Sequence, residues 1–441
     1  MKEARYKKYL LGVLLVILAF NYVDRLALGL VLQSIKADLH LSDTQLGFLG
    51  GIAFALFYSV MGIPIARRAD KGNRVLIIAV TTLLWSAAVA LCGLAGTFWH
   101  LLLIRVGVAV GEAGSIPPAQ SLIADYFQRA ERPRAVGIYM LGASLSTVIG
   151  YFGAGWLNEL YGWRTTFAVL GLPGLGLAAL AWFTLREPRD SALEMPLETP
   201  DSPSSDVSLK EVCVVLWSNH TFRHLLFCFS VVSFFGYGIL QWQPAFFIRS
   251  YGLQTGELGL WFAIIYGLGG VLGTYWGGEL ASRYAANDEG LQLKAMALGY
   301  SSFGVISLMV YLSPNHYLAF ALMAIASVGG SAATGPLFAT IQTLVPKRMR
   351  ATAIALIYLC ANLIGMGLGP LVAGTLSDLL QPIAGEESLR YALLALSPGY
   401  VWGGWHLLRA SKTICGDLQA VELDCENGHH GAETSAKTSV A

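Results

Sequence analysis

The sequence predicts an all-α membrane protein with twelve transmembrane helices in two six-helix bundles. Three observations lead to this fold class. Hydrophobic residues make up 55% of the 441 residues and charged residues only 13%, whereas a soluble domain has about 25% charged residues. Apolar stretches long enough to cross a bilayer recur along the chain. Weakly similar segments also recur six stretches apart, as expected for two related halves.

Six apolar stretches precede a polar linker, and six more follow it. Each is long enough for a helix of roughly 20 residues to cross the hydrocarbon core. They lie at residues 9–35, 44–66, 75–95, 99–127, 134–158, 163–185, 221–249, 256–283, 291–313, 316–345, 349–380 and 387–409. The basic start and first stretch look like a signal peptide, but the stretch is too long and many spans follow. We therefore expect an uncleaved first helix.

These stretches divide the chain into four segments. Residues 1–188 form the N-terminal six-helix bundle, and 220–410 form the C-terminal one. Residues 189–219 form a cytoplasmic linker rich in proline, serine and acidic residues. The end of the linker, from Val207 to Trp217, predicts a short amphipathic helix on the membrane surface. Residues 411–441 form a polar cytoplasmic tail, which we expect to be disordered.

Positive charge predicts the orientation of the spans. With both termini inside, the outer side carries only Lys36, Arg164, Arg249 and Arg390, while nearly all other lysines and arginines fall on the inner side. Such a bias is typical of a protein whose basic loops face the cytoplasm. We therefore expect a multi-pass protein of the cell (inner) membrane with cytoplasmic termini.

Net charge and cysteine content also limit the binding partners and cofactors that we expect. A formal net charge of +1 gives no electrostatic case for nucleic acid. The six cysteines are scattered through apolar stretches, linker and tail, and predict no disulfide framework. We expect no metal and no cofactor apart from a coupling proton, a monomeric chain, and membrane lipids and an amphipathic small molecule as partners.

The two halves resemble each other at matching positions. Pro118 to Ile123 matches Pro336 to Ile341, and Arg134-Ala135 matches Arg350-Ala351. A third set pairs Gly150, Gly155, Leu157, Glu159 and Leu160 with Gly369, Gly374, Leu376, Asp378 and Leu379. The separations run from 216 to 219 residues. Such repeats are typical of a transporter with its site between two halves, near the membrane midplane.

The stretch Asn21-Tyr22-Val23-Asp24-Arg25 places two full charges inside the first apolar run. Each charge costs about 2.5–3.5 kcal/mol on insertion scales. A chain keeps such residues where they face a protein interior or an aqueous cavity, so the first interpretation is a functional site. A buried ion pair that fixes helix packing is the alternative.

A second charged pair lies in the fourth span. Arg105 and Glu112 are seven residues apart, two helical turns, and so share one face. Gly107, Gly111 and Gly114 let another helix approach closely. The first half therefore holds two acids and two bases deep within its spans, away from the span ends. In the second half, Glu279 and Asp378 lie near helix ends, where they can reach water.

The second half offers aromatic, amide and hydroxyl groups instead of deep charges. Such groups amid apolar surface suit a cavity for a large amphipathic molecule. Ordinary helix packing explains any one of them equally well. The candidates are Tyr237, Gln241 and Gln243 in the seventh span, Thr334 in the tenth, and Tyr358 and Asn362 in the eleventh.

Two loops carry a further motif. Residues 66–74 read Ala-Arg-Arg-Ala-Asp-Lys-Gly-Asn-Arg, and 278–283 read Gly-Glu-Leu-Ala-Ser-Arg. Both resemble the Gly-x-Leu-Ala-Asp-Arg-x-Gly-Arg motif of the major facilitator superfamily, at its place after the second helix of each half. The match is imperfect, since Ser282 replaces the acid in the second copy. The resemblance implies that Asp70, with Lys71 and Arg74, forms a conformational gate. Asp70 would accept from the N-terminus of the eleventh helix.

The first two spans extend the resemblance to one branch of that superfamily. Asn21-Tyr22-x-Asp24-Arg25 is followed by Val31-Leu32-x-x-Ile35 and by Ser42-Asp43-x-Gln45-x-Gly47. This pattern resembles the Spinster transporters of lysolipids and sphingosine phosphate. The resemblance implies that Asp24 and Glu112 carry coupling protons. It also implies that Arg25 and Arg105 organise these acids or meet a phosphate.

We therefore expect the major facilitator fold and a proton-coupled secondary transporter of a lysophospholipid or sphingoid phosphate, working by alternating access. The first alternative is a proton-coupled transporter of small organic anions or drugs, since the same arginines would bind a carboxylate. The second is a lipid scramblase or a membrane-embedded enzyme. We expect no enzymatic activity, because the sequence shows no catalytic serine, histidine and aspartate cluster and no phosphate-cradling loop.

Overall fold

The computed structural model describes residues 2–128, 131–189, 209–285, 288–345 and 349–438, and nearly all of these residues are helical. The first part of the chain forms α1 (Lys2–Leu39), α2 (Asp43–Gly50), α3 (Ile52–Lys71), α4 (Arg74–Cys92), α5 (Phe98–Glu112), α6 (Ile116–Tyr126), α7 (Arg132–Val148), the π-helical turn η1 (Ile149–Gly153) and α8 (Ala154–Thr184). The second part forms α10 (Leu209–Ser218), α11 (His220–Tyr251), α12 (Thr255–Tyr284), α13 (Glu289–Leu312), α14 (His316–Ala332), α15 (Thr334–Leu344), α16 (Arg350–Cys360), η3 (Ala361–Leu368), α17 (Gly369–Ala384), η4 (Gly385–Glu387), α18 (Ser388–Leu396) and α19 (Gly399–Thr438).

Short polar side chains fix where several helices begin. Asn73, Thr97, Asn219 and Asn315 each accept a hydrogen bond from a backbone N–H in the first turn of the helix that follows. Ser42 and Gln45 form a reciprocal capping box at the start of α2. Such caps satisfy N–H groups that have no partner within the helix.

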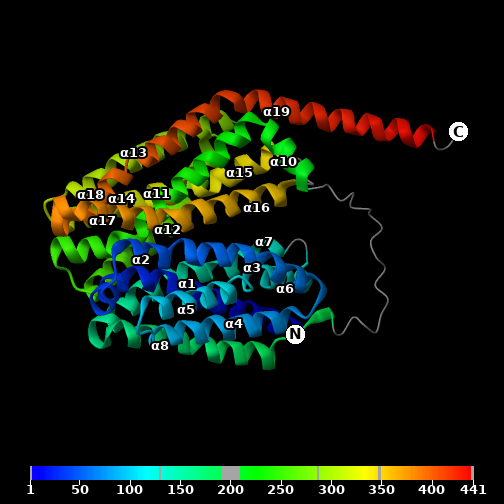
Figure 1. The fold of residues 1–441 in the computed structure, drawn as a ribbon. Helices are drawn as coiled ribbons and strands as arrows, with labels where there is room; N and C mark the ends of the chain where they lie inside the picture. Colours follow the sequence, from blue (N-terminus) through cyan, green and yellow to red (C-terminus); the bar gives the residue numbers. More distant parts are fainter. Residues whose placement is uncertain (1, 129–130, 190–208, 286–287, 346–348, 439–441) are drawn as a thin grey trace.

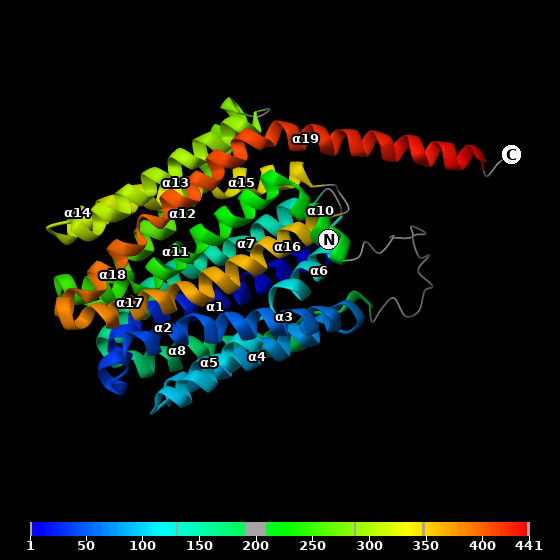
Figure 2. The same cartoon turned by 45° about the horizontal axis from the view of Figure 1, so that its top comes forward.

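The helices gather in two groups that follow the sequence (Figure 1). The helices from α1 to α8 form the lower group in this view, and those from α11 to α19 form the upper group. In the lower group α4 packs against α5 and α8, and α1 packs against α7. In the upper group α19 packs against α11 and α13, and α12 packs against α14. In the turned view the two groups overlap at the centre, with α4 and α5 lowest and α13 and α14 near the top (Figure 2).

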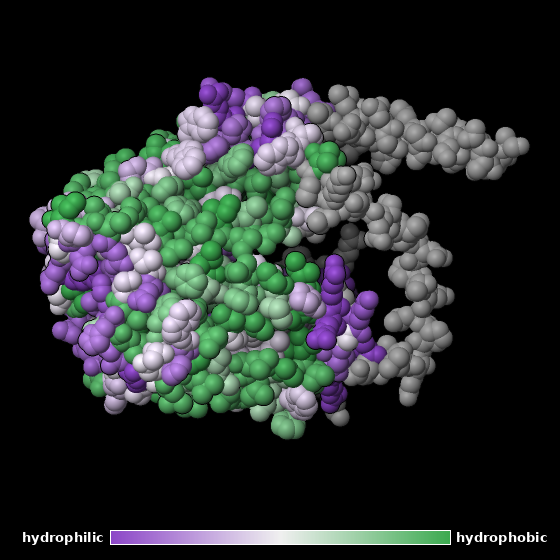
Figure 3. Space-filling view, in the orientation of Figure 1, coloured by the Kyte–Doolittle hydropathy of each residue, from purple (hydrophilic) through white to green (hydrophobic). Residues whose placement is uncertain are grey.

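Within the described residues, ten helical runs are long and apolar enough to cross a membrane. Two of them, Arg134–Thr184 and Thr352–Gln419, contain 51 and 68 residues, far more than the roughly 20 that one crossing needs. The first run leaves helical geometry at Gly162, whose φ of 78° suits glycine. Hydrophobic residues cover the middle of the molecule and hydrophilic residues gather at its ends (Figure 3).

Two expectations outside the spans have different outcomes. A helix is present where one was expected from Val207 to Trp217, as α10 (Leu209–Ser218), while Val207 itself lies outside the described residues and the placement on a membrane surface stays a prediction. The expectation that the tail is disordered is wrong for its backbone, because α19 continues through residues 411–438. Extending an existing helix avoids the cost of nucleation, so a polar sequence can follow an apolar span without a break.

The two groups of helices touch most closely at one end of the molecule. There α2 packs against α17, and α8 packs against α12. At the opposite end, where the N-terminus lies, the surface is hollowed between the groups (Figure 3). We call the end where the two groups touch most closely the outer end. The predicted orientation assigns Lys36, Arg164, Arg249 and Arg390 to the outer side of the membrane.

Candidate functional site

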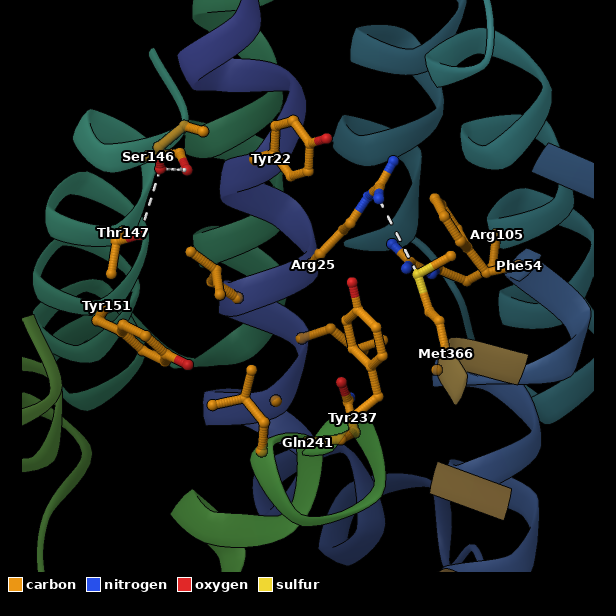
Figure 4. Close-up of a pocket in the computed structure, with 16 residues that line it drawn as sticks. Tyr22, Arg25, Phe54, Arg105, Ser146, Thr147, Tyr151, Tyr237, Gln241 and Met366 are labelled. Carbon is orange, nitrogen blue, oxygen red and sulfur yellow. Dashed lines mark hydrogen bonds between the residues drawn. The ribbon is translucent and has the colours of Figure 1, made fainter. Parts of the chain in front are cut away.

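A cavity of about 190 Å³ lies where the two groups of helices meet (Figure 4). Arg25 and Tyr22 reach it from α1, and Tyr237 and Gln241 from α11 on the other side. The other side chains around it are mostly apolar or aromatic. They include Phe54, Arg105, Ser146, Thr147, Tyr151, Leu240 and Met366. The site therefore combines one half's cations with the other half's aromatic and amide groups.

The four charged residues found in the first-half spans form two crossed ion pairs. Arg25 donates from Nε and Nη2 to Oε2 of Glu112, at 2.7 and 2.5 Å. Arg105 donates from Nη1 to Oδ2 of Asp24 at 2.6 Å. Two adjacent residues of α1 thus bind two residues on one face of α5. The predicted shared face of Arg105 and Glu112 is confirmed, and each buried charge is neutralised by its partner.

The two arginines differ in their access to the cavity. The side chain of Arg25 is 18% exposed and that of Arg105 only 1%. The guanidinium of Arg25 lies 4.6–4.8 Å from the ring centroids of Tyr22, Phe54 and Tyr58. These rings stabilise a cation without neutralising it. Of the two arginines that line this cavity, Arg25 is therefore the one more accessible to a ligand.

Several oxygens beside the ion pairs have no hydrogen-bond partner among the described residues. They are Oδ1 of Asp24, Oε1 of Glu112 and Oδ1 of Asn21, and all three are buried. Asn21 itself donates from its side-chain amide to Ser115 at 3.1 Å. Buried acceptors normally have a donor. These three oxygens can therefore accept a hydrogen bond from a water molecule, and the two carboxylate oxygens can also bind a proton.

The second-half candidates separate into those at the cavity and those elsewhere. Tyr237 and Gln241 line it. Gln243 points away and binds Tyr266 and Tyr311 within the second group of helices. Tyr358 stacks on Phe338, with ring centroids 5.3 Å apart. Asn362 lies in η3 and is not among the lining residues of this cavity.

A second cavity of about 530 Å³ lies within the second group of helices. It shares Tyr237 and Leu240 with the first cavity, so these two side chains form the wall between them. Its other lining residues are Ile239, the amide Gln243, and residues that are aromatic, small or hydroxyl-bearing. They include Gln243, Tyr266, Phe303, Ser327, Gly330 and Tyr400. Gln243, although it points away from Arg25, thus belongs to this second chamber.

The loop motif is only partly described. The side chains of Asp70 and Thr334 lie outside the described side chains, so their predicted roles remain predictions. Lys71 is exposed at the end of α3. Arg74 is fully buried and pairs with Glu187 and, at 2.6 Å, with Asp125. Both partners belong to the first half, so Arg74 ties that half together.

The sequence interpretation missed a network at the outer end. Asp43 accepts from both terminal nitrogens of Arg249 at 2.7 Å, from Lys36 at 2.6 Å and from Ser377 at 2.7 Å. Arg249 and Ser377 belong to the second half and Asp43 to the first. The sequence contained Asp43 in the Spinster-like pattern, but no spacing rule connects it with Arg249, more than two hundred residues away.

Two packed groups of membrane-length helices around an internal cationic cavity are the architecture of a secondary transporter. The sequence profile described as Major Facilitator Superfamily matches residues 14–381. This chain therefore belongs to the major facilitator superfamily, and the resemblance seen in the loop motif is confirmed.

Comparison with individual proteins shows which members of the superfamily this chain is similar to. An "MFS-type efflux pump" of Mycolicibacterium smegmatis is 31% identical over 388 residues, which cover 87% of this chain and 88% of the relative. "Protein spinster homolog 1" of Xenopus tropicalis is 28% identical, with 98% and 86% covered. A similar fold is found in the crystal structure of a bacterial homologue of the human lysosomal transporter Spinster, in an inward-facing and unoccupied conformation. The two sequences are 30% identical, the match covers 93% of this chain and 98% of the other, and the TM-score is 0.79. The Spinster-like character is thus confirmed.

Proposed function

We propose that this protein is a proton-coupled secondary transporter of an amphipathic lipid with an anionic head, a lysophospholipid or a sphingoid phosphate. The observation that carries the proposal is the pair of adjoining cavities. One presents the accessible guanidinium of Arg25, and the other is larger, largely apolar and separated from it only by Tyr237 and Leu240. A head group in the first and a hydrocarbon chain in the second would match this polarity.

The head-group role of Arg25 rests on its geometry. A guanidinium can donate two parallel hydrogen bonds to a phosphate, which gives both affinity and orientation. Arg25 already donates twice to Glu112, so a phosphate would compete with that carboxylate for the same donors. Arg105 is less suited to meet the ligand, since its side chain is almost fully buried.

Proton coupling follows from the same competition. If phosphate takes the donors of Arg25, Glu112 loses its counter-charge in a buried place, and protonation becomes favourable. The free oxygens of Asp24 and Glu112 supply acceptors for that proton. Binding of lipid and proton would then favour each other, which is the energetic link that coupled transport needs.

The proposed topology has twelve crossings, with 1–188 and 220–410 as the two six-helix bundles, 189–219 as cytoplasmic linker and 411–441 as cytoplasmic tail. Two of the ten long helical runs have the length for two crossings each. The distribution of lysine and arginine supports cytoplasmic termini in the inner membrane. Alternating access would then proceed by rocking of the two bundles about the central site.

A transporter of small organic anions or drugs is the second candidate. The first cavity alone, at about 190 Å³, could hold a short-chain anion against Arg25. One relative is named as an efflux pump, which supports this alternative. No comparable observation supports a scramblase or a membrane-embedded enzyme.

Flux measurements in proteoliposomes test the proposal. Purified protein is reconstituted with fluorescent or isotopically labelled lysophospholipids, sphingoid phosphates and short-chain anions, with and without a pH gradient. We expect saturable lipid flux that the gradient accelerates. Flux of the short-chain anion with no lipid flux would support the second candidate, and unsaturable lipid flux independent of the gradient would support a scramblase.

A further inference from the structure

We propose that Glu159 and Asp378 form a matched pair of latches that hold the outer end closed. Each carboxylate caps the N-terminus of a helix in the opposite half. Asp378 of the second half caps α2, and Glu159 of the first half caps α12. The pair is a conformational device, and it does not depend on which substrate the protein carries.

The contact of Asp378 is the more extensive one. Its carboxylate accepts from the backbone N–H of Asp43 at 3.0 Å, from that of Thr44 at 2.7 Å and from the Thr44 hydroxyl at 2.6 Å. Asp43 and Thr44 begin α2. N–H groups in a first helical turn have no partner within the helix and carry the positive end of its dipole. A carboxylate at this position is therefore well matched.

The contact of Glu159 repeats the arrangement with the halves exchanged. Its carboxylate accepts from the backbone N–H of Gly256 at 2.7 Å, in the first turn of α12. Beside it the Thr255 hydroxyl donates to the carbonyl of Gly155 at 3.0 Å. Asn158 donates to the Thr255 hydroxyl at 3.2 Å. Side chains of both helices therefore hold the first turn of α12 to α8, Glu159 and Asn158 from α8 and Thr255 from α12.

A glycine one turn before each acid lets the helices come close enough. A Cβ on Gly374 would overlap the backbone oxygen of Asp43, and a Cβ on Gly155 would overlap that of Thr255. Gly155 and Glu159 occupy the same repeat positions as Gly374 and Asp378. Each half therefore carries the same two-part element, a glycine that admits the partner helix and an acid that caps it.

The two caps affect the equilibrium between the conformation that is closed at the outer end and the one that is open there. Both caps join the two halves at the outer end, so both must break when that end opens. The closed-out conformation thus gains two interactions that an outward-open one cannot have. Removing either acid should shift the equilibrium toward the outward-open state, because a population follows the interactions that differ between two states.

Distances across the outer end test this. In a protein whose six native cysteines are replaced by serine, spin labels at His40→Cys and Gln381→Cys report on the α2–α17 contact. Labels at Tyr161→Cys and Gln254→Cys report on α8–α12. Pulsed electron resonance in nanodiscs without substrate gives the outward-open fraction, so the result is independent of the proposed lipid.

We expect Asp378→Ala and Glu159→Ala each to raise the ratio of outward-open to inward-open protein about fivefold, as loss of a helix cap typically does. The double variant should raise it about 25-fold if the two caps act independently. Asp378→Asn and Glu159→Gln keep the side-chain shape and an accepting oxygen but lose the charge, so they should shift the ratio in the same direction by a smaller factor. Glu386→Gln removes an exposed acid from the same end and should leave the distances unchanged.

Two results would overturn the proposal. One is an unchanged distance distribution in both alanine variants and in both amide variants, with the protein monodisperse on gel filtration. The other is a shift in only one of the two sites, which would show that the pair is not matched. A failure of lipid flux with the expected distance shifts would count against the proposed function and leave the latches standing.

Discussion

Arg25 on α1 places two hydrogen bonds, of 2.7 and 2.5 Å, on the same oxygen of Glu112 on α5. The other oxygen of that carboxylate has no partner among the described residues. One face of the carboxylate is thus held by a permanent cation, and the other is available to a proton. Because the guanidinium also borders the central cavity, events in the cavity can reach Glu112 directly.

Neutral replacement of the acids should uncouple transport from the proton gradient. We expect Asp24→Asn or Glu112→Gln to abolish acceleration of flux by a pH gradient while the protein stays folded, because an amide keeps the shape of the side chain but cannot exchange the proton. Flux in proteoliposomes with and without a gradient measures this. Glu112→Gln should be the milder change to the fold, because it leaves Arg25, which is 18% exposed, without a counter-charge, whereas Asp24→Asn leaves Arg105, which is 1% exposed.

The matched control is Glu279→Gln, which removes an exposed acid paired with Arg283 and should leave gradient dependence intact. Gradient dependence that survives in the purified Asp24→Asn, Glu112→Gln double variant would refute the assignment. If the acids serve only helix packing, both single variants should instead lose expression or thermal stability.

Arg25 should distinguish phosphorylated from unphosphorylated lipids. We expect Arg25→Ala to weaken binding of the phosphorylated lipid about 10- to 100-fold, the loss expected for charge-assisted hydrogen bonds. Binding of the unphosphorylated analogue should change little. Scintillation proximity or calorimetric binding to the detergent-purified protein measures both. An equal loss for the two ligands would rule out the head-group role and indicate a packing effect.

The second cavity should set the accepted chain length. Gly330 lines this cavity, and an added side chain there would extend toward the ring of Phe303. We expect Gly330→Leu to shift preference toward shorter acyl chains, because the side chain fills part of the space. Its neighbour Gly329 is exposed, with open space around it, so Gly329→Leu is the control. Competition by lipids of graded length gives the comparison, and an unchanged series in Gly330→Leu would place the chain elsewhere.

Glu187 should make the first half more stable near neutral pH than in acid. Burial favours a raised pKa for its carboxyl, but hydrogen bonds from the side chain and backbone of Arg74 outweigh burial and lower that pKa. The unfolded chain then binds a proton more readily than the folded one. This contribution to stability is therefore fully present above the ordinary pKa of about 4.3. It is lost as the pH falls through the lowered, folded-state pKa.

Thermal unfolding in detergent measures this effect. At pH 7 we expect Glu187→Gln to reduce stability by about 1–3 kcal/mol, since a buried charge-assisted contact is weakened. The difference from the unmodified protein should shrink as the pH is lowered toward 4 and below. Asp125→Asn is the comparison, because Asp125 also binds Arg74 but its side chain is 41% exposed, and an exposed partner contributes little. A difference that stays constant with pH would show that the charge of Glu187 is not responsible.

The sequence by itself determined the class of the protein and the chemical character of its centre. Long apolar stretches have few stable arrangements in lipid, so composition and hydropathy were enough to predict membrane-spanning helices. Charged residues inside those stretches are costly, which singled out Asp24, Arg25, Arg105 and Glu112. The helical period also placed Arg105 and Glu112 on one face, as the structure has them.

Only the tertiary structure decided which of these groups meet. A helical period tells which residues share a face, but not which helix that face touches or at what height. It therefore could not show that adjacent Asp24 and Arg25 pair crosswise with Arg105 and Glu112. Gln243, two residues from Gln241, belongs to the other cavity because successive residues on a helix point in different directions. Glu159 and Asp378 were visible in the sequence as a repeat, but their partners follow from how the halves close on each other, a long-range contact that no local pattern encodes.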